Sequence, residues 1–313
     1  MLSVSSYLIL VVGPTGVGKT DLCLKLAKKF QTEILSCDSR QFYREMNRGT
    51  AKPSPQELAD VPHHFINNLS ITDSYDVRKY EEESLDLLNH LFKKHRVVLM
   101  TGGTGLFADV VVHGMDEIPE VASQIRDKII QEYQNKGLSW LQGAVKLVDP
   151  EFYEQVDQAN PQRLMRALEV WKGTGQKFSS FRTKKKVVRP FEVIKIGLDR
   201  PREELYQRID QRMERMLADG LYEEAERLVE KRGLNALQTL GYTEVFDFLA
   251  GKYDKTELVR LLKRNSRRYA KRQLTWFRRD AQIRWFHPNQ KEEIESFIES
   301  QIVLNPPNAA TQL

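Results

Sequence analysis

Short apolar runs alternate with longer amphipathic segments along most of the chain. Such runs are typical of buried strands, and apolar residues every three or four positions are typical of helices that cover a sheet. The predicted strands are Tyr7–Val12, Glu33–Cys37, His64–Ile66, Val97–Met100, Glu192–Leu198 and Gln282–Phe286. The predicted helices include Thr20–Phe30, Asp76–Lys94, Ser123–Lys136 and Pro201–Arg232. This alternation predicts an α/β fold with a largely parallel sheet and helices on both faces.

Residues 118–189 interrupt the alternation, because they contain helical patterns and no good strand. Pro119 and Pro190 bracket this stretch. We therefore predict a helical insertion domain, 118–189, within a core domain formed by 1–117 and 190–313. We expect it over the carboxyl edge of the sheet, where open α/β sheets bind ligands.

Composition narrows the class of protein. Hydrophobic residues make up 41% of the 313 residues, which is enough for a normal core, and no apolar run approaches membrane-spanning length. The N-terminus lacks the basic start of a signal peptide. Cys23 and Cys37 have neither disulfide-framework nor metal-site spacing, so we expect both thiols to be buried and the protein to be cytoplasmic. Because no apolar run is long enough to span a membrane, we also expect no membrane contact.

Positive charge is concentrated near the C-terminus. Ten basic residues and a single acid, Asp280, lie between Arg260 and Arg284, whereas the whole chain has a net charge of only +5. Basic residues recur there every three or four positions, which favours a phosphate contact with nucleic acid over an ordinary solvated helix. Trp276 and Phe277 fit stacking on RNA bases and fit a protein core equally well.

A phosphate-binding loop follows the first predicted strand. The motif GPTGVGKT has the spacing of a P-loop between a strand and a helix. Its residues are Gly13, Pro14, Thr15, Gly16, Val17, Gly18, Lys19 and Thr20. The glycines let backbone N–H groups surround phosphate oxygens, Lys19 adds a charge, and the Thr20 hydroxyl can reach Mg²⁺.

Polar residues also follow two other predicted strands. Asp38, at the start of the motif DSRQ, fits a Mg²⁺ ligand or a general base, and a helix-capping role is an equal alternative. Thr104, in the motif TGGTG, fits a ligand contact or a simple turn. The strand before it lacks the Walker B carboxylate that an NTP-hydrolysing motor needs.

A helix rich in arginine follows the motif LDRP. Helical spacing places Arg208, Arg212 and Arg215 on one face, where one of them could clamp an anion over the P-loop. A solvated face with several glutamates is the alternative. His63 and His64 point to opposite faces of a strand, so we assign them neither a shared metal nor a catalytic role.

Seven motifs, spread over nearly the whole chain, together resemble the tRNA dimethylallyltransferase (isopentenyltransferase) family. They are GPTGVGKT, DSRQ, GTAKP at Gly49–Pro53, GGTGL, NPQRLMRALEV at Asn160–Val170, LGY at Leu240–Tyr242, and KRQLTWFR at Lys271–Arg278. The P-loop is shared with many kinases, but the set as a whole is specific. Small departures from the family pattern are Phe42, where Val is common, and Arg48, where Ile is common.

The resemblance implies a reaction. The family transfers a dimethylallyl group from dimethylallyl diphosphate to the exocyclic amine of the adenosine 3′ of the tRNA anticodon. The P-loop would then hold a diphosphate with Mg²⁺ near Thr20, which explains the missing Walker B acid. Asp38 would be the base, Thr104 a substrate contact and Arg208 the diphosphate clamp.

The resemblance also implies tRNA as a partner of a monomeric enzyme, with contacts along the chain. The implied tRNA contacts are Asp38, Ser39, Arg40, Gln41, Thr104, Arg126, Gln162, Arg163, Leu164, Met165, Arg166, Lys271, Arg272, Gln273 and Arg278. Three alternatives are an isopentenyltransferase acting on free adenine nucleotides, a small-metabolite P-loop kinase, and a non-catalytic RNA-binding protein.

Overall fold

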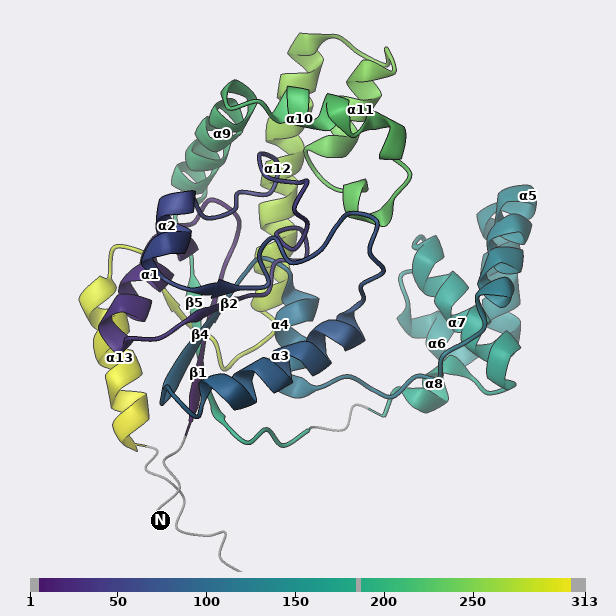
Figure 1. Ribbon diagram of the computed structural model, residues 1–313. Coiled ribbons are helices and arrows are strands. Elements are labelled where there is room, and N and C mark those ends of the chain that lie inside the picture. The colour runs from purple at the N-terminus through teal and green to yellow at the C-terminus, as the bar shows by residue number, and fades with distance from the viewer. Residues whose placement is uncertain (1–5, 184–186, 305–313) are drawn as a thin grey trace, which may run out of the picture. The chain divides into compact units, whose positions relative to one another are not determined.

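The computed structural model describes residues 6–183 and 187–304. Six parallel strands form one sheet in the order β3-β2-β4-β1-β5-β6 (Figure 1). The strands are β1 (Tyr7–Val12), β2 (Ile34–Ser36), β3 (His63–His64), β4 (Val97–Thr101), β5 (Glu192–Leu198) and β6 (Arg284–Phe286). The predicted parallel α/β sheet is confirmed, and β4 lies between β1 and β2.

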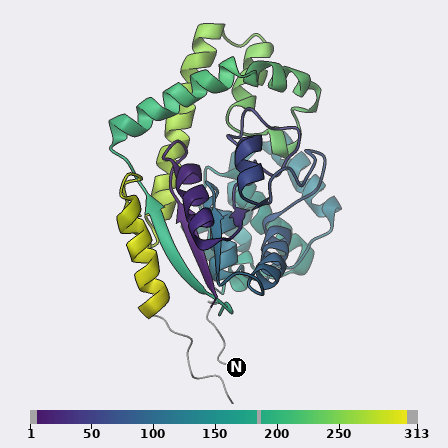
Figure 2. The same ribbon diagram turned by 60° about the vertical axis from the view of Figure 1, so that its left-hand side comes forward.

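Helices cover both faces of the sheet. Every residue of β1 is buried, because alternate side chains point to opposite faces and both faces are covered. Tyr7, Ile9 and Val11 pack in one cluster with α1 (Lys19–Phe30) and α13 (Lys291–Leu304). The helices α3 (Val77–Leu91) and α4 (Gly105–His113) lie on the other side, and Figure 2 shows α13 and α3 on opposite sides of the sheet.

The remaining helices of the core lie around the carboxyl ends of the strands (Figure 1). They are α2 (Pro55–Asp60), α9 (Arg202–Ala218), α10 (Leu221–Arg227), α11 (Tyr242–Leu249) and α12 (Lys255–Phe277), with short 3-10 turns η1 (Val229–Lys231) and η2 (Asn235–Leu237). Met213, Leu221, Tyr242 and Leu262 pack in one cluster that joins α9, α10, α11 and α12. These helices thereby form a support for the loops at the sheet edge.

Two predicted elements differ from the structure. The helix expected over Pro201–Arg232 ends at Ala218, because Gly220 adopts φ +98° and starts a new helix, α10. The strand expected over His64–Ile66 is instead His63–His64, because Phe65 at φ +61° and Asn67 at φ +57° leave the extended region.

The described chain divides into two compact units. One comprises the described residues up to His113 and from Val188 onward, and the other is Gly114–Val187. The second unit contains α5 (Ser123–Val148), α6 (Pro150–Gln155), α7 (Pro161–Thr174) and α8 (Phe178–Phe181) around its own hydrophobic cluster. Within the described residues, no helix has the length and apolar character needed to span a membrane.

Candidate active site

The segment Gly13–Thr20 joins β1 to α1. Gly13 has φ +149°, and a Cβ there would lie 2.6 Å from the Leu198 carbonyl oxygen, so only glycine fits. Gly18, at φ +110°, is the N-cap of α1. The first N–H groups of this helix, which have no hydrogen-bond acceptor within the helix, therefore lie next to the loop and favour a bound anion. The Lys19 ammonium donates to the Gly13 and Pro14 carbonyl oxygens at 2.9 and 3.0 Å.

Three cations meet at this loop. Arg208 Nε donates to the Gly16 carbonyl oxygen at 2.9 Å, and Arg212 Nη2 donates to Thr15 Oγ1 at 2.5 Å. Burial lowers the pKa of Lys19 to about 8 and that of Arg212 to about 10, although the Asp38 charge partly opposes both shifts. The Nε atom of Arg212 is buried and has no hydrogen-bond partner among the residues that the structure describes. Half-buried cations in such excess favour a multiply charged anion as ligand.

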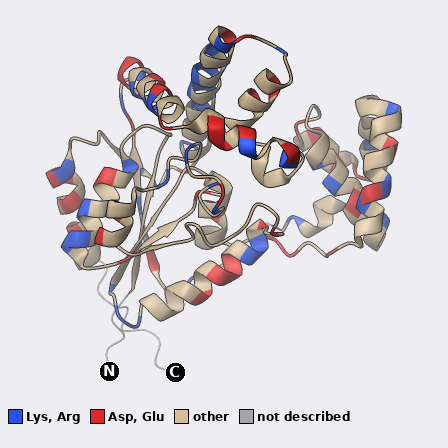
Figure 3. Ribbon diagram, turned by 45° about the horizontal axis from the view of Figure 1, so that its top comes forward, with Lys and Arg blue, Asp and Glu red and all other residues tan. Residues whose placement is uncertain are grey.

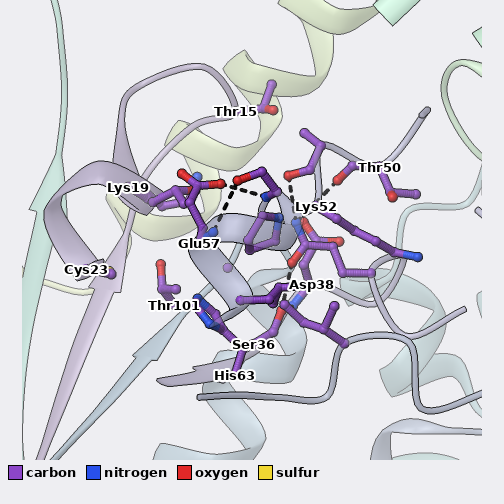
Figure 4. A pocket seen from close by; sticks show the side chains of 18 of the residues that line it. Thr15, Lys19, Cys23, Ser36, Asp38, Thr50, Lys52, Glu57, His63 and Thr101 are labelled. Atoms are coloured by element: carbon purple, nitrogen blue, oxygen red, sulfur yellow. Dashed lines mark hydrogen bonds between the residues drawn. The ribbon is translucent and has the colours of Figure 1, made fainter. Parts of the chain in front are cut away.

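Asp38 follows β2 and lines the same pocket as Lys19, Arg208 and Arg212. Figure 4 shows Asp38 and Lys19 in this pocket. Its Oδ1 accepts the Arg40 backbone N–H at 3.1 Å. Burial raises the pKa of Asp38, whereas that N–H group and the charges of Lys19, Arg40 and Arg212 partly offset the rise. A half-buried carboxylate with a raised pKa is suited to accept a proton from a substrate.

Thr104 and Ser39 connect the loops after β4 and β2. Thr104 Oγ1 accepts the Ser39 backbone N–H at 3.1 Å and lies 3.2 Å from Ser39 Oγ. The structure thus brings the predicted residues of the DSRQ and TGGTG motifs together. Burial raises the pKa of Tyr269, on α12, whose hydroxyl is near Asp38 and hydrogen-bonds with Thr104.

The other two residues of the DSRQ motif bond within the protein. Gln41 accepts from Ser36 Oγ at 3.0 Å and donates to the Ala51 carbonyl oxygen at 3.1 Å. Arg40 donates to the carbonyl oxygens of Asn235 and Ala236 at 3.0 and 3.2 Å. These side chains shape the loops, so any RNA contact they make must use their remaining donors.

A buried carboxylate that the sequence analysis missed holds the loop before GTAKP. Glu224, on α10, is 5% exposed and accepts the backbone N–H groups of Asn47 and Arg48 and the Tyr242 hydroxyl. A Cβ on Gly49 would lie 2.5 Å from the Tyr242 ring. The GTAKP and LGY motifs, which are far apart in the sequence, therefore pack directly against each other.

These loops enclose a pocket of about 810 Å³, which also contacts α2 and α9 (Figure 4). His63 lines it, and its Nδ1 donates to the Val61 carbonyl oxygen at 2.7 Å. Burial lowers the pKa of His63, which favours a neutral ring with Nε2 free to accept. His64 instead contacts Glu33 at 2.6 Å, so the two histidines point apart as predicted.

The oxygen donors of the pocket fit a hard divalent cation. Thr20 and Asp38 both line it. In the described part of the chain, no group of three or more His, Cys, Asp or Glu residues could hold a metal ion by itself. A cation here would therefore take most of its ligands from a bound phosphate group and water, which is usual for Mg²⁺.

The basic helix α12 has more acidic partners than its sequence suggests. Lys263 contacts Glu214, and Arg267 contacts both oxygens of Asp210 at 2.7 Å. Arg278 likewise contacts Asp199 at 2.6 Å. The exposed basic residues for which no acidic partner is found among the described residues are Arg268, Lys271, Arg272, Arg279 and Arg284. Figure 3 shows the basic residues along this helix and on α9.

Three residues near the end of α12 face the protein interior. Phe277 is buried, and Trp276 donates to Asp109 at 2.9 Å while packing on Gly105, where a Cβ would lie 2.2 Å from the indole. The core alternative is therefore correct for both aromatics. Gln273 is also buried, and its amide is engaged by backbone groups of the protein. Its contact with tRNA stays a prediction.

The predicted tRNA contacts of the inserted unit differ in how far their side chains are buried. Leu164 and Met165 pack in the hydrophobic cluster of that unit, and their contact with RNA stays a prediction. Gln162 and Arg163 are exposed at the start of α7. Arg126 and Arg166 lie 3.2 and 3.4 Å from the buried carboxylate of Glu169, which orients both guanidinium groups.

Known proteins resemble this chain over nearly its full length. A family model described as IPP transferase matches residues 41–280. The chain is 49% identical to a tRNA dimethylallyltransferase of Cytophaga hutchinsonii, covering 96% of this chain and 99% of that protein. It is 46% identical to tRNA dimethylallyltransferase 1 of Bacteroides fragilis, over 94% and 98% of the two chains.

Solved structures agree with this similarity. The full-length tRNA isopentenylpyrophosphate transferase of Bacillus halodurans superposes with a TM-score of 0.70 at 34% identity, over 96% of this chain and 97% of that one. A eukaryotic dimethylallyltransferase acting on tRNA superposes with a TM-score of 0.79, over 98% and 82%. Its identity of 23% supports the fold alone.

Proposed function

The chain belongs to the IPP transferase family and is a prenyltransferase that modifies tRNA, and from this premise we propose its donor, acceptor atom and catalytic residues. The donor is dimethylallyl diphosphate, and the acceptor is the exocyclic amine, N6, of the adenosine 3′-adjacent to the anticodon. The product is the N6-dimethylallyl adenosine in tRNA, together with diphosphate. The observation that carries this proposal is a half-buried carboxylate, Asp38, whose pKa burial raises, in one pocket with the P-loop cations Lys19 and Arg212.

The cations stabilise the leaving group. As the allylic C–O bond breaks, negative charge grows on the diphosphate. Lys19, Arg208 and Arg212 already converge on the loop, so their charges need little rearrangement to meet it. A divalent cation, which we propose to be Mg²⁺ bound by Thr20 and the diphosphate, would supply further counter-charge.

Asp38 acts on the acceptor. The lone pair of the adenine amine is delocalised into the ring, which makes the amine a poor nucleophile. As the new N–C bond forms, the amine loses a proton, and the Asp38 carboxylate accepts it. The adenosine must leave the stacked anticodon loop to reach the pocket. Thr104, fixed by Ser39, lies beside Asp38 to contact the flipped nucleotide.

The tRNA contacts form two groups. Lys271 and Arg272 on α12, and Arg278 directly after it, bind phosphates of the anticodon stem-loop, since all three are exposed. Arg126, Gln162, Arg163 and Arg166 provide the contacts of the inserted unit with the same stem-loop. We propose a monomeric enzyme in the cytoplasm.

The deciding experiment incubates the protein with Mg²⁺, dimethylallyl diphosphate and a tRNA that has adenosine 3′ of the anticodon. We expect the mass of one dimethylallyl group on that nucleotide. Free adenosine monophosphate serves as the competing acceptor, and ATP with small metabolites tests for kinase activity. Prenylation of the free nucleotide without prenylation of tRNA would contradict the proposal.

A further inference from the structure

Gln273 connects two loops that are far apart in sequence. Its Oε1 accepts the Thr15 backbone N–H at 2.8 Å, and its Nε2 donates to the Gly103 carbonyl oxygen at 2.8 Å. The side chain is 5% exposed, so water does not compete for either bond. A single buried amide on α12 thus bridges the P-loop and the loop after β4.

Each loop carries one half of the proposed reaction. On the donor side, the Thr15 hydroxyl accepts from Arg212, which faces the diphosphate site. On the acceptor side, Asp38 Oδ2 lies 3.4 Å from the position that a Cβ on Gly103 would take. The next residue, Thr104, contacts Ser39. Gln273 therefore lies between the groups that hold the leaving group and the group that accepts the proton.

The Gln273 side chain packs tightly against the backbone of Gly103. A Cβ on Gly103 would lie 2.3 Å from its Nε2, so the backbone can approach only because residue 103 is glycine. The bridge needs one acceptor and one donor at the ends of a side chain of this length. Asparagine is too short to reach both loops, and a glutamate carboxylate cannot donate to the Gly103 carbonyl oxygen.

We propose that Gln273 is a positioning residue that sets the spacing between the diphosphate loop and Asp38. This inference rests on the proposed function. Prenyl transfer requires the allylic carbon, held through its diphosphate, to approach the amine that Asp38 deprotonates. A misplacement of about 1 Å between reacting groups can lower a rate about a hundredfold, so a fixed bridge has a direct effect on turnover.

The first test compares two variants of α12. Gln273→Leu removes both hydrogen bonds and keeps much of the volume. Ser266→Ala is the control, because Ser266 is also buried on the same helix and its hydroxyl has no hydrogen-bond partner within the described part of the chain. We expect kcat to fall about a hundredfold in Gln273→Leu, with the Kd for tRNA unchanged, and wild-type values in Ser266→Ala. Wild-type kcat in folded Gln273→Leu overturns the proposal.

The second test uses the pH dependence of the reaction. Gln273→Glu places a second carboxylate near Asp38, and like charges raise the pKa of a carboxyl group. The acid limb of the kcat/KM profile is expected to move to higher pH in Gln273→Glu and to stay near its wild-type position in Gln273→Leu. Superimposable profiles for wild type and Gln273→Glu would show that residue 273 is not in contact with the catalytic base.

The third test does not depend on activity. The Thr15 N–H group is protected by Gln273, so its hydrogen–deuterium exchange should become faster in Gln273→Leu and not in Ser266→Ala. Unchanged exchange overturns the bridge itself. Failure of the wild-type protein to prenylate tRNA would reject the proposed function, while faster exchange in the variant would still establish the bridge between the loops.

Discussion

The Tyr242 hydroxyl donates a hydrogen bond of 2.6 Å to the buried carboxylate of Glu224, which also accepts two backbone N–H groups from Asn47 and Arg48. One carboxylate thereby holds a loop that begins nearly 180 residues earlier in the chain. The loop lines the pocket through Arg48, Thr50 and Lys52. The GTAKP motif, which contains Gly49, and the LGY motif, which contains Tyr242, are therefore joined through Glu224.

Removing this carboxylate should destabilise the protein. Glu224→Ala removes the acceptor of three part-buried N–H groups, those of Asn47, Arg48 and Gly49, and of the buried Tyr242 hydroxyl, and we expect a loss of about 2–4 kcal/mol in the free energy of unfolding. Tyr242→Phe deletes only one of the bonds and should cost about 1 kcal/mol. Urea unfolding measures both values. Equal losses in the two variants would mean that the loop amides find other acceptors.

Asp38→Asn should separate catalysis from stability. If Asp38 is the base, kcat falls about 10²–10⁴-fold while the Kd for tRNA stays constant. Because burial raises the pKa of Asp38, its ionisation opposes folding: the stability present at low pH is lost as pH rises through the folded-state pKa. The amide that replaces the carboxyl group cannot ionise, so the variant should melt at a higher temperature than wild type near neutral pH. A melting temperature lower than wild type would contradict this cost of ionisation.

Binding of the donor should take up a proton at alkaline pH. The pKa of Lys19 is lowered to about 8 by burial, and a bound diphosphate would raise it again. Titration calorimetry at about pH 8.5 in buffers of different ionisation enthalpy should therefore detect uptake, which vanishes near pH 6.5, where Lys19 is already protonated. The Lys19→Met variant is the control. Equal uptake in that variant would assign the proton to another group.

The salt dependence of tRNA binding should distinguish exposed from paired cations on α12. Lys271→Ala and Arg272→Ala each remove an exposed charge, so each should lower the slope of log K against log salt by about one. Arg267→Ala removes a guanidinium already bonded to both oxygens of Asp210, and its slope should stay near the wild-type value. The reverse order of effects would place the RNA on the α9 side of the helix.

Local sequence patterns predict the fold and part of the site. Apolar runs locate the strands, and the P-loop, Asp38 and Thr104 follow because each lies directly after a predicted strand. Helix breaks were harder, since the pattern does not show that Gly220 would turn to φ +98° within a continuous amphipathic run. Leu164 and Met165 lie inside a family motif, but the helical period already places apolar residues there in a core.

Long-range pairing could not be predicted from local patterns. The basic segment near the C-terminus has almost no acids in its own sequence, yet Asp210 and Glu214 reach it from α9. The roles of Glu224 and Gln273 could not be predicted for the same reason, because the backbone groups that they bind lie more than 100 residues away in the sequence. Only the three-dimensional contacts distinguish these buried side chains from ordinary surface residues.

Because β4 lies between β1 and β2, the order of the strands sets the distance between the loops that follow β1 and β2. Neighbouring strands are about 4.8 Å apart, so the ends of β1 and β2 are about 10 Å apart. A donor whose diphosphate is bound after β1 and whose carbon reacts beside Asp38 must then lie across the end of β4. Gly102 and Gly103 occupy that end, and at Gly102 a Cβ would lie 2.5 Å from the Cys37 carbonyl carbon. The sheet therefore sets the distance between the diphosphate site and Asp38, which the reacting carbon and the acceptor amine must together span.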